Sequence, residues 1–187
     1  MTLDEIRIKI DKIDTQMKEL FLEGMECAKG VANVKKETGG DVFVLERELS
    51  MIDRTSKDLD LQVKEEYIMF LRHLMSLSRH LQYGILSKMQ ENVLNSLLNN
   101  DNIKDKKISS KKVEISFICD EKNSDLNLYI NMIKLNKIDI EKMDLTVKNG
   151  VQNINITLVG DISSHNMRIL LCQLGKEAKE LKILKLA

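Results

Sequence analysis

The chain has 187 residues, which suffice for one large domain or two small ones. Its 29 Lys and Arg residues balance 29 Asp and Glu residues, so no overall charge attracts it to nucleic acid or to a membrane surface. No apolar run reaches the length of about 18 residues that indicates a transmembrane helix.

Three scattered cysteines, Cys27, Cys119 and Cys172, lack the spacing of metal ligands. Each lies in an apolar pattern, so we expect all three to be buried and reduced, as in a cytoplasmic protein. The charged, amphipathic N-terminus also argues against a secretory signal. We therefore expect a cytoplasmic protein without a metal site.

Apolar or small side chains recur every three or four positions through the first 35 residues, at Leu3, Ile6, Ile10, Ile13, Met17, Leu20, Gly24, Cys27, Val31 and Val34. This spacing predicts one long helix that packs against other helices and ends at the Gly39-Gly40 pair. Arg7 and Lys35 interrupt the pattern and, by the rise of a helix, stand about 42 Å apart. A small ligand cannot contact both, so a site that uses both requires two chains or a broken helix.

Two more helices are predicted, a short one over residues 46–57 and a long one over residues 64–98. The short helix carries the charged pair Arg47-Glu48. In the long helix, Ser78 and Gln82 are one turn apart and share a face beside an apolar stripe. Polar groups in such a place need partners, and a hydrogen bond within the core is the simplest alternative to a functional role. Taken singly, Arg7, Lys35 and Arg47 are more typical of solvated charges on a helix surface.

Residues 99–112 are polar and lysine-rich, which predicts a linker between a helical domain, residues 1–98, and a second domain, residues 113–187. Beyond the linker the periodicity changes to alternating strands and two helices. The predicted order is strand 113–119, helix 124–135, strand 138–147, a returning strand through 154–158, a helix capped by Ser163 or Ser164, and strand 181–186. Alternation slips near Glu141-Lys142, which indicates a bulge, and Asn149-Gly150 is a hairpin signal.

The order β-α-β-β-α-β is that of the ferredoxin-like split motif, an α+β fold. About 75 residues of such a fold bury a limited core, which favours pairing with a second copy.

The first 90 residues resemble a chorismate mutase of the all-helical type. The matching segments are LDEIRIKIDKID at residues 3–14, the lysine of VANVK at 31–35, the pair Arg47-Glu48, and SRHLQ at 78–82. Their order on a long, a short and a long helix carries the resemblance. It implies a three-helix chain that intertwines with a second copy in a homodimer, each site taking residues from both chains.

The reaction implied is the rearrangement of chorismate to prephenate in aromatic amino-acid biosynthesis, which is unimolecular and needs no metal or cofactor. The resemblance implies that Lys35 and Gln82 stabilise negative charge on the ether oxygen of the substrate. It also implies that Glu48 accepts the ring hydroxyl. Guanidinium groups suit the two substrate carboxylates because they form paired hydrogen bonds with them.

For carboxylate binding, the resemblance implies Arg47 with the help of Ser78, and Arg7 reaching into the partner's site. At Val44 many members of the family have an aspartate, and the contact there is expected to use the backbone.

One position departs from the family. Counting back from Lys35, the second arginine of the first helix falls on Gly24. Either another cation, with Lys29, Arg54 and Arg79 as candidates, fills the gap, or the activity is weakened or lost. The alternatives are a catalytically inactive sensor or regulatory protein of the same ancestry, and a mutase or lyase for a chorismate analogue.

The second half resembles an ACT domain, a small regulatory module that often binds amino acids. The resemblance rests on the order of elements and on NKIDIEKMD at residues 136–144. It implies an amino-acid effector in the loop formed by Asn123, Ser124, Asp125 and Leu126. A dimerisation or packing module without a ligand is the alternative, because residues 142–145 replace the Glu-Ser-Arg-Pro motif of phenylalanine-sensing relatives.

Overall fold

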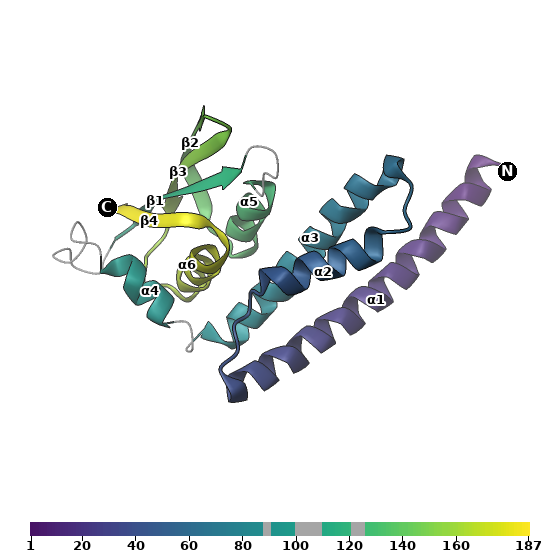
Figure 1. Ribbon diagram of the computed structural model, residues 1–187, viewed down its shortest axis with the longest axis horizontal. Helices are drawn as coiled ribbons and strands as arrows, with labels where there is room; N and C mark the ends of the chain where they lie inside the picture. Colours follow the sequence, from purple (N-terminus) through teal and green to yellow (C-terminus); the bar gives the residue numbers. More distant parts are fainter. Residues whose placement is uncertain (88–90, 100–109, 121–125) are drawn as a thin grey trace.

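The computed structural model describes residues 1–87, 91–99, 110–120 and 126–187, and places three helices beside a smaller α+β unit (Figure 1). In chain order the elements are α1 (Leu3–Thr38), α2 (Leu45–Ser56), α3 (Leu61–Ile85), α4 (Glu91–Leu98), β1 (Lys112–Asp120), α5 (Leu126–Leu135), β2 (Asp139–Lys148), β3 (Val151–Val159), α6 (His165–Glu177) and β4 (Lys179–Leu186). The helical elements come first and the sheet follows, as the change in periodicity predicts.

Helix α1 begins and ends where its sequence provides caps. Thr2 and Glu5 form a capping box at its start, each side chain bonding the backbone N–H of the other. Gly39 ends it in the left-handed conformation, with φ of 76°, and donates its N–H to the carbonyl of Lys35. This stop turns the chain back toward α2 and α3.

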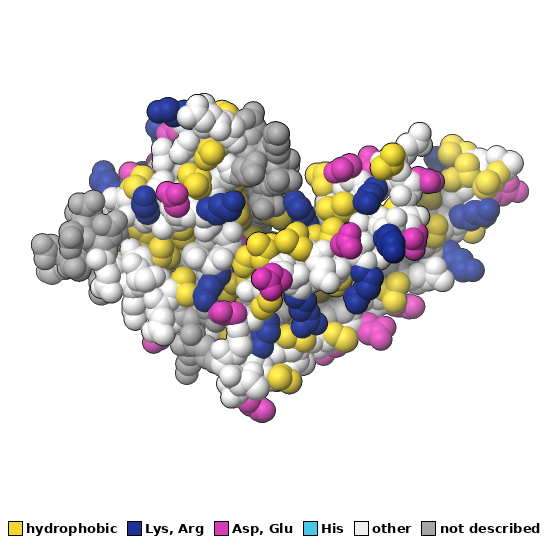
Figure 2. All heavy atoms as spheres, viewed as in Figure 1, with side chains coloured by type: hydrophobic (Ala, Val, Ile, Leu, Met, Phe, Trp, Pro, Cys, Tyr) yellow, Lys and Arg dark blue, Asp and Glu magenta, His cyan; other side chains and the backbone are white. Residues whose placement is uncertain are grey.

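Along α1 only Ala28 and Ala32 are buried, and the helix packs against α3. The apolar seam nearer its N-terminus stays exposed at Leu3, Ile6, Ile10, Ile13, Met17 and Leu20. Part of this apolar surface is visible at the N-terminal end of α1 in Figure 2. The expectation that all three cysteines are buried is wrong for Cys27, which lies on α1 and is exposed, whereas Cys119 and Cys172 are buried. Burial raises the pKa of the Cys172 thiol to about 11.

The predicted single helix over residues 64–98 is wrong, because α3 ends at Ile85 and a separate helix, α4, follows. Gly84 lowers helix propensity just before the end, and Leu86 closes α3 by donating its N–H to the carbonyl of Gln82. Helix α4 packs against α6 and β4 instead of continuing the three-helix unit. Its Leu94 is buried in the same cluster as the sheet residues.

The sheet has the strand order β2-β3-β1-β4, with every neighbouring pair antiparallel. This arrangement is compatible with a ferredoxin-like fold. The register between β2 and β3 shifts between Ile140 and Lys142, where the sequence indicates a bulge. Asn149 and Gly150 both have positive φ values, as a two-residue hairpin turn requires.

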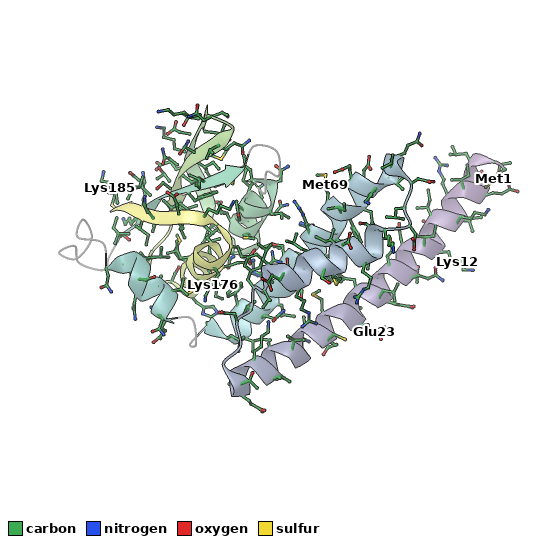
Figure 3. The ribbon with its side chains drawn as sticks, viewed as in Figure 1. Met1, Lys12, Glu23, Met69, Lys176 and Lys185 are labelled. Atoms are coloured by element: carbon green, nitrogen blue, oxygen red, sulfur yellow. The ribbon has the colours of Figure 1, made fainter. Side chains whose placement is uncertain are left out.

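The two halves are in contact. The C-terminal part of α3 packs on α5 and α6, and Tyr83 and Leu86 join the buried cluster formed by the sheet and its helices. In Figure 3, Lys176 lies at this junction, whereas Met1 lies at the far end of α1, with Lys12 further along the same helix. No helix in the described part of the chain is long and apolar enough to cross a bilayer.

Candidate functional site

Lys35, Ser78 and Gln82 form a hydrogen-bonded chain where the end of α1 meets α3. The Nζ of Lys35 donates to the carbonyl of Val42 at 3.1 Å and to Oε1 of Gln82 at 3.4 Å. The Nε2 of Gln82 in turn donates to Oγ of Ser78 at 3.4 Å. The end of α1 at Gly39 makes the contact between Lys35 and Val42 possible, because the left-handed turn there brings Val42, in the connector, back beside the last turn of α1.

The charge of Lys35 lies among groups of both signs. Burial lowers the pKa of the Lys35 ammonium, and the positive charge of Arg47 lowers it further. The carboxylates of Asp41 and Glu48 act in the opposite direction, without cancelling the shift. Lys35 therefore combines a partly desolvated cation with an amide partner, an arrangement suited to stabilising negative charge on a ligand oxygen.

Glu48 and Arg79 form an ion pair beside this group. Glu48 lies in the first turn of α2, and NH1 of Arg79, on α3, donates to its Oε1. The other side of the Arg79 guanidinium is held by Glu177 at the end of α6, with Nε to Oε1 at 2.8 Å and NH2 to Oε2 at 2.6 Å. One cation thus links two carboxylates from different halves of the chain.

Arg79 is almost fully buried, and its guanidinium carbon lies 5.0 Å from the ring centroid of Phe43. Burial alone would lower the pKa of Arg79, but the hydrogen bonds and charges of Glu177 and Glu48 outweigh it and raise that pKa. For the Glu177 carboxyl, burial raises the pKa and Arg79 opposes the rise. Arg79 therefore remains a cation at any physiological pH.

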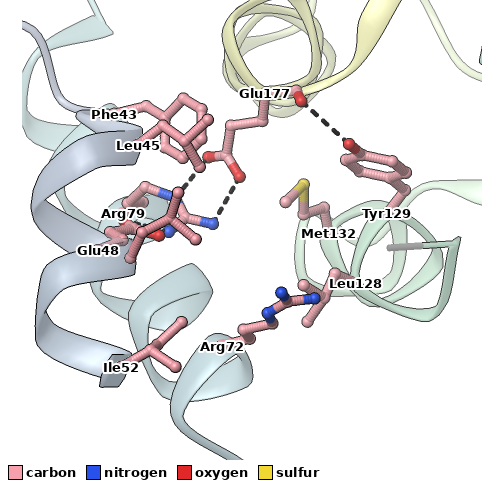
Figure 4. Close-up of a pocket in the computed structure, with 11 residues that line it drawn as sticks. Phe43, Leu45, Glu48, Ile52, Arg72, Arg79, Leu128, Tyr129, Met132 and Glu177 are labelled. Atoms are coloured by element: carbon pink, nitrogen blue, oxygen red, sulfur yellow. Dashed lines mark hydrogen bonds and ion pairs between the residues drawn. The ribbon is translucent and has the colours of Figure 1, made fainter. Parts of the chain in front are cut away.

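A cavity of about 90 Å³ lies between α2, α3, α5 and α6 at this ion pair (Figure 4). In Figure 4 the side chains of Arg72 and Arg79 come from α3, Leu128, Tyr129 and Met132 from α5, and Glu177 from the end of α6. The cavity holds charges of both signs on largely apolar walls. It lies on the side of Glu48 that faces the C-terminal half.

The remaining predicted substrate contacts are exposed. Arg7 lies near the start of α1, pairs with Asp4 at 3.2 Å, and keeps 65% of its side chain in solvent. Arg47 is exposed on α2, and Val44 occupies the N-cap position of that helix without a side-chain cap. It is the carbonyl of Val42, not a group of Val44, that contacts Lys35.

Gly24 lies on an exposed turn of α1, and apart from its chain neighbours and the adjacent helix backbone, no atom of the described residues lies within 4 Å of a Cβ added there. Of the three candidate cations, Lys29 pairs with Glu26 on the same helix, and Arg54 is exposed on α2. Arg79 is committed to its two carboxylates. None of the three stands free beside Lys35 in the described part of the chain.

Three of the four predicted effector-binding residues, Asn123, Ser124 and Asp125, lie outside the described residues. Leu126 begins α5 and packs against the core of the C-terminal half. Among the described residues, no three side chains of His, Cys, Asp or Glu are grouped so that they could hold a metal ion.

Sequence reasoning missed the role of Glu177 and named Arg79 only as a substitute for the arginine absent at Gly24. The two residues are 98 positions apart, so no local pattern links them. The only signal was that Gln173 and Glu177, one turn apart, interrupt the apolar pattern of α6.

Comparison with known families gives one match. The model of the chorismate mutase type II family matches residues 6–83, which span nearly all of α1, the whole of α2 and most of α3. The matched segment contains Lys35, Glu48, Ser78 and Gln82, and it excludes the C-terminal sheet. No curated protein and no solved structure matches the chain.

Proposed function

We propose that this protein is a chorismate mutase that converts chorismate to prephenate, working as a homodimer whose sites draw on both chains. The family match over residues 6–83 supports the activity. The observation that carries the proposal is the hydrogen bond from Lys35 Nζ to Gln82 Oε1, which joins the two groups that the reaction needs at one oxygen.

The reaction breaks a carbon–oxygen bond while a carbon–carbon bond forms, so negative charge develops on the ether oxygen. A cation and a hydrogen-bond donor held at that oxygen stabilise the transition state more than the ground state. Lys35 supplies the cation. Gln82 Nε2 carries two hydrogens, and its bond to Ser78 uses one, which leaves the other for the ether oxygen.

The substrate is a dicarboxylate that must bend into a compact, chair-like shape before it reacts. In this proposal Arg47 and Ser78 hold one carboxylate near Lys35, and Glu48 accepts the ring hydroxyl. Holding the bent conformation supplies a further part of the rate acceleration through orientation.

The dimer is supported by α1. Its exposed seam from Leu3 to Leu20 has the spacing of a helix–helix contact but is uncovered in the described part of this chain. Arg7 and Lys35 lie on the same helix about 42 Å apart, so they serve one site only if Arg7 comes from the partner subunit. A second copy would both cover the seam and deliver that arginine.

A chorismate depletion assay without added metal tests the activity, with prephenate identified as the product. Lys35→Ala should lower kcat at least 100-fold. Lys36→Ala is the matched control, because Lys36 is the next residue of α1 and points to solvent. Equal rates for the Lys35→Ala variant and the unchanged protein would show that Lys35 is not part of the catalytic site.

A second candidate function follows from Gly24. A protein of this fold that lacks one carboxylate-binding arginine could be a sensor with little or no turnover. The space around Gly24 accepts a side chain, so Gly24→Arg separates the cases. A large gain from a near-zero rate would favour the sensor, whereas no change or a loss would favour a working pocket of altered design. Product analysis with isochorismate and the amino analogue of chorismate tests a changed substrate.

We also propose that the C-terminal half is an ACT-like regulatory domain for an amino-acid effector. The order of its elements and the antiparallel sheet support the assignment. Adding each aromatic amino acid in turn to the depletion assay tests it. A rate that responds to none of them would leave only the similarity of fold.

A further inference from the structure

We propose that Glu177, in the C-terminal half, is a positioning residue for the Glu48 carboxylate and acts through Arg79. The inference rests on the proposed function, in which Glu48 accepts the ring hydroxyl of the substrate. It extends that function by making the catalytic geometry depend on a residue outside the matched helical segment.

The contacts of Arg79 fix its guanidinium in one orientation. Glu177 binds it through two parallel hydrogen bonds, from Nε at 2.8 Å and from NH2 at 2.6 Å. Such a paired contact sets the plane as well as the position of the guanidinium. The third donor, NH1, then points at Glu48 Oε1. In Figure 4 the two carboxylates lie on different sides of the same guanidinium.

Glu177 is itself held firmly by the C-terminal half. Only 4% of its side chain is exposed, and Gln173, one turn earlier on α6, donates its Nε2 to Glu177 Oε1 at 3.1 Å. The hydroxyl of Tyr129, on α5, donates to the backbone carbonyl of Glu177 at 3.0 Å. The position of the Glu177 carboxylate is therefore set by α5 and α6. Arg79, which binds both carboxylates, in turn fixes the position of Glu48 on α2.

The consequence for Glu48 is that Arg79 engages one oxygen, Oε1, and leaves Oε2 to accept a ligand hydroxyl. Without Glu177, the buried guanidinium would have only one carboxylate partner here. Arg79 would then be free to offer both of its terminal amino groups to Glu48, as arginine commonly does with a single carboxylate. That would occupy the second oxygen and turn Glu48 away from the substrate.

A second ion pair between the halves offers a matched control. Lys176, the residue before Glu177, pairs with Asp41 at 2.7 Å, but both side chains are partly or largely exposed. Exposed pairs contribute little to stability, and this one does not touch Glu48 or Arg79. Removing the Lys176–Asp41 ion pair eliminates one contact between the halves and leaves the ion pairs of Arg79 with Glu48 and Glu177 intact.

The test is a double-mutant cycle on kcat/KM with chorismate, in the full-length chain. Glu177→Gln should lower kcat/KM by roughly 10-fold to 100-fold, the effect of a misplaced contact group. Lys176→Ala should stay within about twofold of the unchanged protein. Glu177→Gln added to Glu48→Ala should cost nothing further, because a residue that acts through Glu48 has no effect once that carboxylate is gone.

The cycle separates positioning from mere support of the fold. If the losses from Glu177→Gln and Glu48→Ala multiply in the double variant, Glu177 acts by another route and the inference is overturned. Circular dichroism and a thermal midpoint check that each variant folds. Should Glu177→Gln fail to fold, Glu177→Asp and Arg79→Lys complete the same cycle, since each keeps the charge but breaks the paired geometry.

The activity of the unchanged protein with chorismate shows whether this inference alone fails or the proposed function fails as well. If it does not convert chorismate, the proposed function fails, and the inference that rests on it fails as well. If it converts chorismate and Glu177→Gln matches it in kcat/KM, the inference alone is overturned.

Discussion

Lys35 and Gln82 are 47 residues apart in the chain, yet the lysine ammonium lies 3.4 Å from the glutamine carbonyl oxygen. The contact joins the last turn of α1 to α3, and a backbone carbonyl, that of Val42, holds the lysine from a second side. Two elements and a connector therefore define where the cation lies.

The activity should fall at alkaline pH earlier than an ordinary lysine would require. Burial and then Arg47 lower the pKa of Lys35 below its usual 10.5. The protonated form stabilises the ether oxygen, so kcat/KM should be constant near neutral pH and fall as pH rises through this lowered pKa. A pH profile of kcat/KM measures this decrease. In Lys35→Arg, whose side chain keeps its charge, the decrease should occur at higher pH. If it occurs at the same pH, it is due to a group other than Lys35.

Gln82→Ala should lower kcat about 100-fold while changing KM little, because the amide acts on charge that appears only in the transition state. Ser78→Ala should cost much less, since Ser78 supports the amide and assists one carboxylate. Steady-state kinetics of both variants give the comparison. An increase in KM alone for Gln82→Ala would show that the amide binds substrate and transition state equally.

Much of the helical half could be predicted because its determinants are local. The apolar spacing, the glycine at position 39 and the shared face of Ser78 and Gln82 all act within one or two turns. The bulge near Lys142 and the turn at Asn149 have equally local signals. Local rules also bring Lys35 to the end of its helix, from which a short connector returns to α3.

What could not be predicted depends on contacts distant in sequence. The apolar pattern of the third helix runs on beyond Ile85, so nothing local shows that α4 packs on the sheet instead. The exposure of Cys27 follows from which face of α1 is covered, and that is a property of packing. Glu177 meets Arg79 only after both halves have folded.

The dimer should depend on the exposed seam of α1. Ile13→Glu places a charge in the middle of that seam and should convert the protein to a monomer with greatly reduced activity. Ile8→Glu is the matched control, because helical spacing puts Ile8 on the opposite side of α1. Analytical ultracentrifugation gives the mass and the depletion assay the activity. A monomeric unchanged protein with full turnover would contradict the shared site.

Removing Arg79 should destabilise the protein by about 3–5 kcal/mol, because Arg79→Met leaves the carboxylate of Glu177 buried without its cation. Urea denaturation gives the free energy of unfolding, and Lys176→Met, which cuts the exposed ion pair with Asp41, should change it by less than about 1 kcal/mol.

The loss of stability in Arg79→Met should also depend on pH. Burial raises the pKa of Glu177, and without Arg79 the opposing influence is gone. In the folded variant the carboxyl therefore binds a proton at a higher pH than it does when unfolded. The folded state then holds more protons across that range, so the free energy of unfolding should rise as pH falls through the raised pKa. Arg79→Met/Glu177→Leu, which lacks the carboxyl, should not show this rise, and the same rise in the double variant would assign it to another group.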